Sequence, residues 1–225
     1  MAGHVFKIRS KTPTETLVDR VVQKYAGQNV DIVVAYLRAK DSSGNVLGEV
    51  SVSSGDWSSH KITKTITIST SGTLAYLSLD SSDGAELYKY TLPEPKSVNS
   101  GDTVYVEWLI GIQLGTNCQN VDNLLEYIEG NTSVDLAIDG ITFFESGSAV
   151  KTFNSSNATV NVTPDTINNQ VVVQVTFTSD ITFGYDQITL INSFGVSLIT
   201  LSATGSVNSG VETTVTITVT VKKPT

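Results

Sequence analysis

The chain has 225 residues, of which 26 are serine and 29 are threonine, while charged residues make up only 16%. This composition suits strands with one apolar face and one hydroxyl face, and it argues against long surface helices rich in Glu and Lys. The net charge of −8 argues against nucleic acid as the main partner, because a phosphate backbone needs a basic surface.

The N-terminal residues 1–11 form a basic arm that contains His4, Lys7, Arg9 and Lys11. The alternatives for such an arm are that it binds an acidic neighbour, an anionic membrane surface or nucleic acid, or that it stays a solvated terminus. It lacks the apolar stretch of a secretory signal, and no run in the chain reaches the roughly 18 apolar residues of a membrane helix. We therefore expect a protein that is made in the cytoplasm.

An internal repeat accounts for the rest of the chain. The segment SVNSG at 97–101 recurs at 206–210, and flanking apolar residues agree, as in 66–68 (ITI) against 175–177 (VTF). The matches follow one order along the chain, so we predict repeat 1 over 12–114 and repeat 2 over 115–225. Residues 116–225 carry three basic and ten acidic side chains, so repeat 2 is the acidic one.

A short helix is predicted at the start of each repeat. Thr12 and Glu15 fit a capping box with Pro13 at the first helical position, and Gly27 and Gly130 are placed to end the two helices in a left-handed conformation. Apolar stripes at helical spacing comprise Leu17, Val18, Val21, Val22 and Tyr25 in repeat 1, and Val121, Leu124, Leu125 and Ile128 in repeat 2. Both helices are too short to be stable alone, so each must dock on its own sandwich or on a neighbouring one.

The remaining residues predict strands that are joined by turns. The candidate strands of repeat 1 are 30–40, 46–52, 61–70, 74–80, 86–92 and 103–112. Those of repeat 2 are 134–145, 149–153, 158–163, 170–178, 185–191, 196–202 and 212–222. The last strand alternates Val or Ile with Thr, as expected for a half-buried strand. We predict an all-β fold of two tandem β-sandwich domains of jelly-roll type, each preceded by a short α-helix, with an immunoglobulin-like sandwich as the alternative.

Few residues indicate chemistry. Asp80 and Asp83 share a Gly-bearing turn that would suit calcium, but the equivalent turn 192–195 has no carboxylate, so we interpret it as a plain hairpin turn. The only cysteine, Cys118, could act as a nucleophile with His60 as its base, yet no motif supports this pair. The sequence does not exclude a glycosidase site made of two paired carboxylates, because residues distant in sequence can converge in a fold. We expect no catalytic residue, no metal site, no cofactor and no enzyme.

Two kinds of surface site are predicted. Tyr105 and Leu109 point outward from the last strand of repeat 1, where repeat 2 has threonines, and Tyr88 lies on another strand of repeat 1. An apolar, aromatic outer face indicates packing on another protein, so we predict these three as interface residues, repeat 1 as the assembly-facing domain and repeat 2 as the exposed one. N-glycosylation sequons, about as many as chance predicts, begin at Asn131, Asn154, Asn157 and Asn161.

A tandem pair of sandwiches with few charges, many threonines and valines and no recognisable catalytic motif resembles the turret or penton-base proteins of turreted icosahedral archaeal viruses. The resemblance covers the whole chain and lies in length, duplication and composition. It implies a virion structural protein, a capsid protein that forms a pentamer at the five-fold vertex with other capsid proteins as partners, one repeat being seated in the shell.

Two other classes stay open. One is a subunit of a cell surface or filament, adhesin-like or pilin-like, with an extracellular location. The other is a carbohydrate-binding module in which Trp57, next to Asp56, stacks on a sugar. The fold alone does not decide among these classes.

Overall fold

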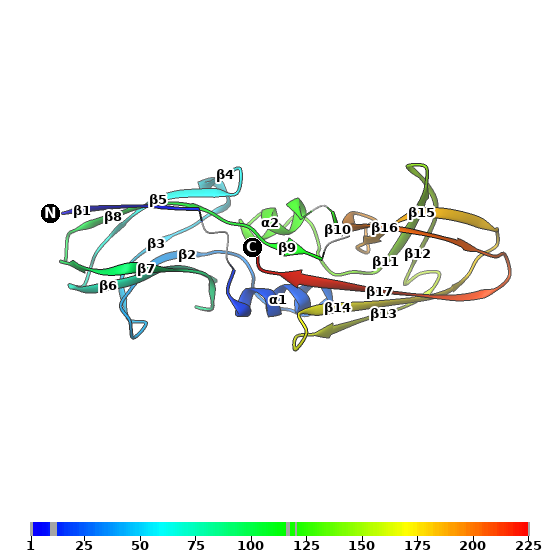
Figure 1. Cartoon of the computed structure of the whole chain (residues 1–225), viewed down its shortest axis with the longest axis horizontal. Coiled ribbons are helices and arrows are strands. Elements are labelled where there is room, and N and C mark those ends of the chain that lie inside the picture. Colours follow the sequence, from blue (N-terminus) through cyan, green and yellow to red (C-terminus); the bar gives the residue numbers. More distant parts are fainter. Residues whose placement is uncertain (1, 10–12, 116–117, 120, 225) are drawn as a thin grey trace.

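The structure is a computed structural model that describes residues 2–9, 13–115, 118–119 and 121–224. It shows two β-sandwiches that lie end to end, with two helices between them (Figure 1). The predicted all-β class with two sandwiches is therefore confirmed. Neither helix of this described part is long and apolar enough to cross a membrane.

The first sandwich consists of two four-stranded sheets. One has the order β3-β2-β6-β7 and contains Val46–Ser51, Tyr36–Lys40, Gly72–Asp80 and Glu86–Val98. The other has the order β1-β8-β5-β4 and contains Gly3–Ile8, Thr103–Leu109, Lys61–Thr67 and Trp57–Ser58. A short 3-10 turn, Ser54–Asp56, precedes β4.

The second sandwich repeats this arrangement. Its first sheet has the order β12-β11-β15-β16-β10 and contains Ser148–Asn154, Gly140–Glu145, Phe183–Ile191, Ser197–Val207 and Cys118–Gln119. Its second sheet has the order β13-β14-β17-β9 and contains Thr159–Asp165, Gln170–Thr178, Glu212–Lys222 and Gln113–Leu114. Residues 113–114 thus belong to the second sandwich, although the repeat boundary was placed after them.

Strands β2–β8 and β11–β17 occupy the same places in their sandwiches. If the seven strands of each set are lettered A to G in chain order, one sheet has the order B-A-E-F and the other has the order C-D-G. The sheets of an immunoglobulin sandwich instead contain strands A-B-E-D and C-F-G. One stretch of the sequence alignment is wrong by two residues. Ile66 pairs with Val104 of β8, and the equivalent of Val104 on β17, Thr213, pairs with Phe177. The equivalent of Ile66 is therefore Phe177, not Val175. A shift of two keeps every side chain on its face, so periodicity alone could not detect it.

The first helix, α1, spans Glu15–Tyr25 and begins two residues later than predicted. Its N-cap is Thr14, whose hydroxyl accepts a hydrogen bond from the Leu17 amide at 3.2 Å. Thr12 lies outside the described residues, and Pro13 forms a β-bridge with Tyr88 instead of the first helical turn. The sheet decides this boundary, because the Thr14 amide donates to the Leu87 carbonyl at 2.9 Å and keeps the chain extended up to that point.

The second helix, α2, spans Asp122–Ile128. Gly27 and Gly130 follow the two helices with φ of 77° and 99°, which confirms the predicted left-handed stops. The apolar stripe of α1 is fully buried, and in α2 the side chains of Leu124, Leu125 and Ile128 are buried. The predicted buried faces of both helices are therefore correct except at Val121, which is half-buried and precedes α2 as its N-cap.

The two helices are exchanged between the sandwiches. Helix α1 lies against β13, β14 and β17 of the second sandwich as well as β7 of its own, and the Tyr25 carbonyl accepts a hydrogen bond from Ile138 N at 2.9 Å. In return, the Ile128 carbonyl of α2 accepts one from Val34 N at 2.8 Å. Tyr25 is the repeat equivalent of Ile128, and Val34 is the equivalent of Ile138. The two halves therefore contact each other reciprocally, like two subunits about a two-fold axis.

This exchange accounts for two wrong strand boundaries. Segments 30–35 and 134–139 were predicted as the first parts of strands, but the chain has no regular strand there. Their backbone groups bond across the junction instead, as the Val34 and Ile138 amides do. The buried side chains of both sandwiches and both helices form one continuous hydrophobic cluster. The chain should therefore behave as a single folding unit.

The basic arm is a strand over most of its length. Residues Gly3–Ile8 form β1, which lies parallel to β8 with six paired residues. Phe6 and Ile8 point toward the core, while Val5 and Lys7 are exposed. The arm is thus neither a loose terminus nor wholly free to bind a membrane, because the apolar side chains that alternate along it complete the first sandwich.

Candidate functional site

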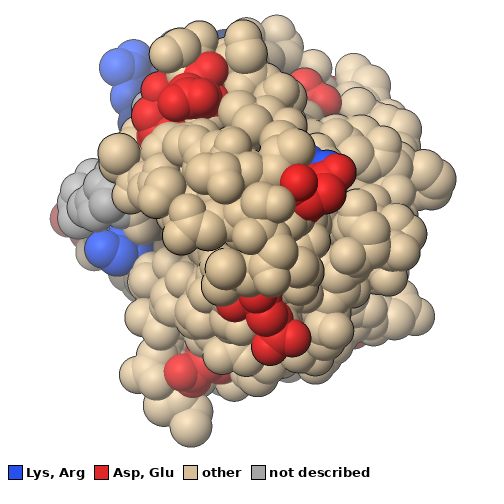
Figure 2. Space-filling model, turned by 90° about the vertical axis from the view of Figure 1, so that its right-hand side faces the viewer, with Lys and Arg blue, Asp and Glu red and all other residues tan. Residues whose placement is uncertain are grey.

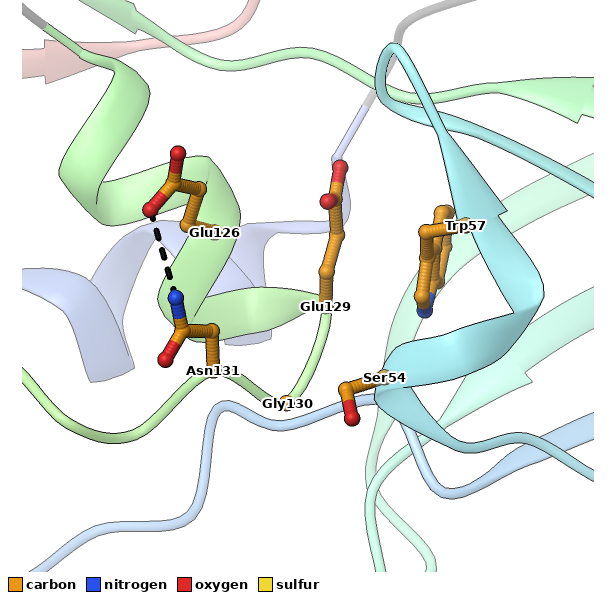
Figure 3. A pocket seen from close by; sticks show the side chains of 6 residues that line it. All are labelled: Ser54, Trp57, Glu126, Glu129, Gly130 and Asn131. Atoms are coloured by element: carbon orange, nitrogen blue, oxygen red, sulfur yellow. Dashed lines mark hydrogen bonds between the residues drawn. The ribbon is translucent and has the colours of Figure 1, made fainter.

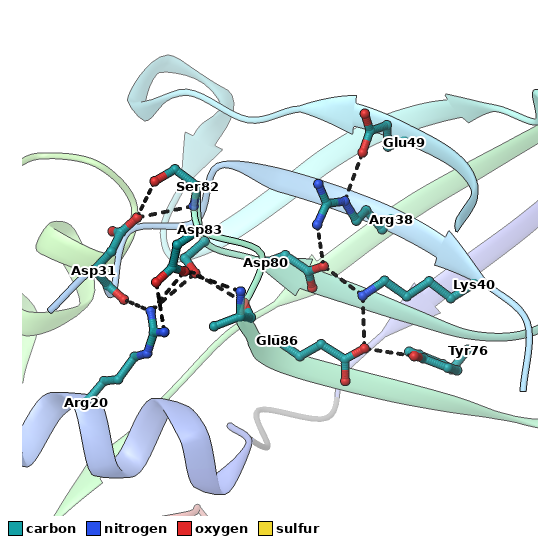
Figure 4. A network of polar contacts seen from close by, with 12 residues as sticks. Arg20, Asp31, Arg38, Lys40, Glu49, Tyr76, Asp80, Ser82, Asp83 and Glu86 are labelled. Atoms are coloured by element: carbon teal, nitrogen blue, oxygen red, sulfur yellow. Dashed lines mark hydrogen bonds and ion pairs between the residues drawn. The ribbon is translucent and has the colours of Figure 1, made fainter. Parts of the chain in front are cut away.

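A network of charged side chains lies on the outer face of the sheet β3-β2-β6-β7 (Figure 4). Asp80, at the end of β6, accepts hydrogen bonds on Oδ2 from Arg38 at 2.9 Å and from Lys40 at 2.8 Å. Lys40 also donates to Glu86 at 2.9 Å, and Glu86 accepts a further bond from the Tyr76 hydroxyl at 2.8 Å. Neighbouring strands carry these groups at paired positions, so the sheet register fixes the geometry.

The network is unusually buried for an outer sheet face. Asp80 is 0% exposed and Lys40 is 6% exposed, and Oδ1 of Asp80 has no hydrogen-bond partner among the described residues. Burial by itself would raise the pKa of Glu86, but the hydrogen bonds from Lys40 and Tyr76 outweigh it, and the pKa lies below its ordinary value. Buried opposite charges of this kind hold a surface rigid and fix its shape.

The equivalent face of repeat 2 carries threonines instead. Thr142 and Thr152 lie within 3.0 Å of each other through their hydroxyls, and Thr189 and Thr200 within 3.2 Å. The charged network is therefore a property of repeat 1 alone. Because the cores of the two repeats are alike, this difference points to different surroundings for the two outer faces.

The two carboxylates of the turn after β6, those of Asp80 and Asp83, bind different partners. Asp83 forms an ion pair with Arg20 of α1 at 2.9 Å and also accepts a hydrogen bond from the Ser81 hydroxyl, and the Arg20 bond lowers its pKa. Asp80 instead faces the sheet network. With Gly84 at φ 85°, the segment is a hairpin turn that also fastens α1. Within the described ranges, no group of three His, Cys, Asp or Glu side chains could hold a metal ion.

A cleft of about 400 Å³ lies between the two repeats and is lined by Ser54, Trp57, Glu126, Glu129, Gly130 and Asn131 (Figure 3). Trp57 comes from β4 of the first sandwich, whereas the two glutamates come from α2 and its end. The indole Nε1 of Trp57 is buried without a hydrogen-bond partner in the described part of the chain. The cleft is therefore lined by an aromatic ring, carboxylates and an amide.

His60 links the repeats beside this cleft. Its Nδ1 lies 2.7 Å from Oε1 of Glu129. Ser59 and His60 form the two-residue turn between β4 and β5, both with positive φ (50° and 59°), a conformation that non-glycine residues adopt only at a cost. Burial raises the pKa of Glu129 in spite of the nearby histidine. The contact with Glu129 holds this strained turn in place.

Tyr88 cannot be an interface residue, which corrects the sequence prediction. Its side chain is 0% exposed, and its hydroxyl donates to the Gly111 carbonyl at 3.2 Å. A register shift between Leu79 and Asp80 pairs Tyr88 with the core residue Leu79 and therefore turns it inward. Strand alternation read from the sequence does not reveal such a bulge.

Tyr105 and Leu109 do lie on an outer face. They are half-buried on β8, where Tyr105 pairs with the exposed Val5 of β1 and with Thr65 of β5. Beside them is a hollow of about 230 Å³ lined by Lys7, Ile8, Arg9, Lys61, Glu107 and Leu109. The sequence missed Val5, although it alternates with Phe6 and Ile8 in the same segment.

The four sequon asparagines are spread over repeat 2. Asn131, Asn157 and Asn161 are exposed and Asn154 is half-buried, with Asn131 at the cleft. Asn154 and Asn157 are engaged in their own turn, where Asn157 Oδ1 accepts from the Asn154 amide at 2.8 Å. The side chain of Cys118 lies outside the described residues, while its backbone pairs with Leu201.

Comparison with known proteins gives no relative: no protein-family model, no curated protein and no solved structure matches the chain.

Proposed function

We propose that this chain is a non-enzymatic structural protein of a virion, a component of the capsid vertex that assembles through the outer faces of its sheets. It associates with copies of itself, as a pentamer, and with other capsid proteins. The observation that carries the proposal is the difference between the outer faces of two repeats whose cores are alike.

The outer face of β8 and β1 has the composition of an interface. Val5 is 65% exposed and lies next to Tyr105, while Lys7, Lys61 and Glu107 surround them. An aromatic and aliphatic centre with a charged rim is typical of surfaces that bind other proteins. On β17, the positions equivalent to Tyr105, Glu107 and Leu109 are all threonine.

Repeat 2 presents a different surface. Its free end is largely uncharged, with more acidic than basic side chains (Figure 2). An end with few charges and an acidic excess suits a domain that projects into solvent, and the apolar face around Val5 and Tyr105 suits the domain seated in an assembly. The continuous core between them makes the projecting domain rigid with respect to the seated one.

Replacing Tyr105 and Leu109 with serine should weaken self-association by roughly tenfold to hundredfold, because aromatic and aliphatic anchors dominate interface energies. The monomer should stay folded, since both side chains are only half-buried. Light scattering over a concentration series measures the effect. The matched control is Phe194→Ser with Ile167→Ser, an aromatic and an aliphatic side chain of repeat 2 that are 81% and 92% exposed, and an oligomer unaffected by the first pair of changes contradicts the proposal.

Native mass spectrometry separates the remaining classes. Five copies, or a multiple of five, support a vertex protein, and an open-ended series supports a filament or cell-surface subunit. A chain that stays monomeric at all concentrations overturns the assembly proposal.

The cleft at Trp57 favours carbohydrate binding as a second candidate function. Aromatic rings stack on sugars, and the side chains of Glu126 and Asn131 in the same cleft provide groups that bond to sugar hydroxyls. Trp57→Ala should then abolish retention on a glycan array, and Trp57→Phe should weaken it, since a smaller ring remains for stacking. Equal binding by all three proteins, or no glycan binding by the unaltered chain, excludes this function.

A further inference from the structure

Strand β17 has an open edge. From Glu212 to Thr220 it pairs with β14 on one side, while on the other side β9 covers only Val221 and Lys222. The backbone from Glu212 to Thr220 therefore has no strand partner on that side within the described residues. Such an edge is a template for another strand.

The same edge is covered in the first sandwich, where β1 pairs with β8. The coverage is visible in the burial of equivalent side chains. Val106 and Trp108 of β8 are 0% exposed, whereas their equivalents on β17, Val215 and Ile217, are half-buried and 9% exposed. The second sandwich thus lacks a strand that the first one has.

The open edge has none of the usual protections against pairing. Edge strands are commonly blunted by lysine, proline or a bulge. Residues 213–220 contain only Thr, Val and Ile, and β17 pairs with β14 without a register shift. In Figure 1 it runs as a long straight strand from the far end of the second sandwich to the centre.

The sequence of this edge is self-complementary. Residues 214–220 read T-V-T-I-T-V-T in both directions. If two copies pair antiparallel about a two-fold axis through Ile217, Thr214 lies opposite Thr220, Val215 opposite Val219 and Thr216 opposite Thr218. Opposite residues point to the same face, so threonine rows and apolar rows both continue across the contact, and such β-branched pairs stabilise sheets.

We propose that β17 is a self-association edge, at which two copies of the chain join their sheets β13-β14-β17-β9 into one continuous sheet in the register centred on Ile217. The contact is isologous and closes on itself. The inference rests on the proposed self-assembly, of which it names one contact. It is distinct from the face at Tyr105 and Leu109 and, being isologous, cannot lie within a five-membered ring, so it joins copies of two different pentamers, and copies that use both contacts form decamers.

Cysteine cross-linking tests the register. In a Cys118→Ser background, chains with Thr216→Cys are mixed with chains with Thr218→Cys and oxidised, and mixed disulfide dimers are measured by non-reducing electrophoresis and peptide mass spectrometry. The inferred register brings these two positions opposite each other. A mixture of Thr214→Cys and Thr218→Cys chains, which are offset by two residues, is the matched control and should cross-link far less. Equal or absent cross-linking in the two mixtures overturns the register.

A charge at the edge tests the contact itself. Thr216→Lys with Thr218→Lys places lysines opposite each other and should raise the dimer Kd by roughly tenfold or more; both side chains are exposed, so the fold should persist. The control is Ser202→Lys with Thr204→Lys, on exposed positions of β16 in the other sheet of the second sandwich. Unchanged association in the first variant overturns the inference. If self-association persists in the first variant but is lost with Tyr105→Ser and Leu109→Ser, the proposed function stands without the β17 contact. An unaltered chain that is strictly monomeric overturns both the proposed function and the β17 contact.

Discussion

Replacing Phe143 with alanine should destabilise the protein by about 3–5 kcal/mol and should shift the unfolding of both sandwiches together. Phe143 is 0% exposed, and its ring centroid lies 4.8–6.2 Å from four other rings, those of Phe153, Phe177, Phe183 and Tyr185. Its removal leaves a cavity that neighbouring rings on rigid strands cannot fill.

The shared unfolding follows from the exchanged helices. Helix α1 packs on β13, β14 and β17 of the second sandwich, and the buried side chains of both halves form one cluster, so one half cannot unfold without exposing the core of the other. The two tryptophans, Trp57 and Trp108, both lie in repeat 1, so their fluorescence reports on the half without the substitution. In urea titrations the tryptophan transition of Phe143→Ala should move to lower urea together with the circular dichroism transition.

The control is Phe194→Ala, the same chemical change at a ring that is 81% exposed, which should alter stability by less than about 0.5 kcal/mol. If the tryptophan transition of Phe143→Ala stays at its original urea concentration, the two repeats unfold independently, and the exchanged helices do not couple them.

Asp80→Ala should have an effect of similar size, about 3–5 kcal/mol, because it leaves two cations beside a buried position without their shared carboxylate. Lys40 has a 7% exposed side chain and forms ion pairs with Asp80 and Glu86. The matched control is Glu49→Ala, which removes the other carboxylate bonded to Arg38; that group is 48% exposed, so the loss should stay below about 1 kcal/mol.

A compensating variant separates the cost of an unpaired charge from the loss of packing. Asp80→Leu combined with Lys40→Met replaces the buried pair by apolar groups and should recover much of the stability, since such replacements are often neutral. Free energies of unfolding from tryptophan fluorescence decide the matter. A value for Asp80→Ala that equals that for Glu49→Ala shows that the buried network contributes nothing special.

The candidate site shows a clear division between what could be predicted and what could not. The threonine row of β17 and the outward positions of Tyr105 and Leu109 follow from alternation along one strand, which the sequence displays directly. The inward orientation of Tyr88 could not be predicted, because it results from the register shift at Leu79 and Asp80 in the pairing of β7 with β6. The charged network and the cleft at Trp57 combine residues from several elements, and nothing local in the sequence links them.

By itself, the sequence determined the fold class, the duplication, the buried stripes of both helices and the two glycine stops, because each of these depends on spacing within a short segment. Only the tertiary structure decided that the helices pack across the junction, that the helix cap is Thr14, and that the basic arm is a strand on β8. Periodicity specifies which face of a segment must be buried, but the surface that buries it is set by the packing of distant parts of the chain.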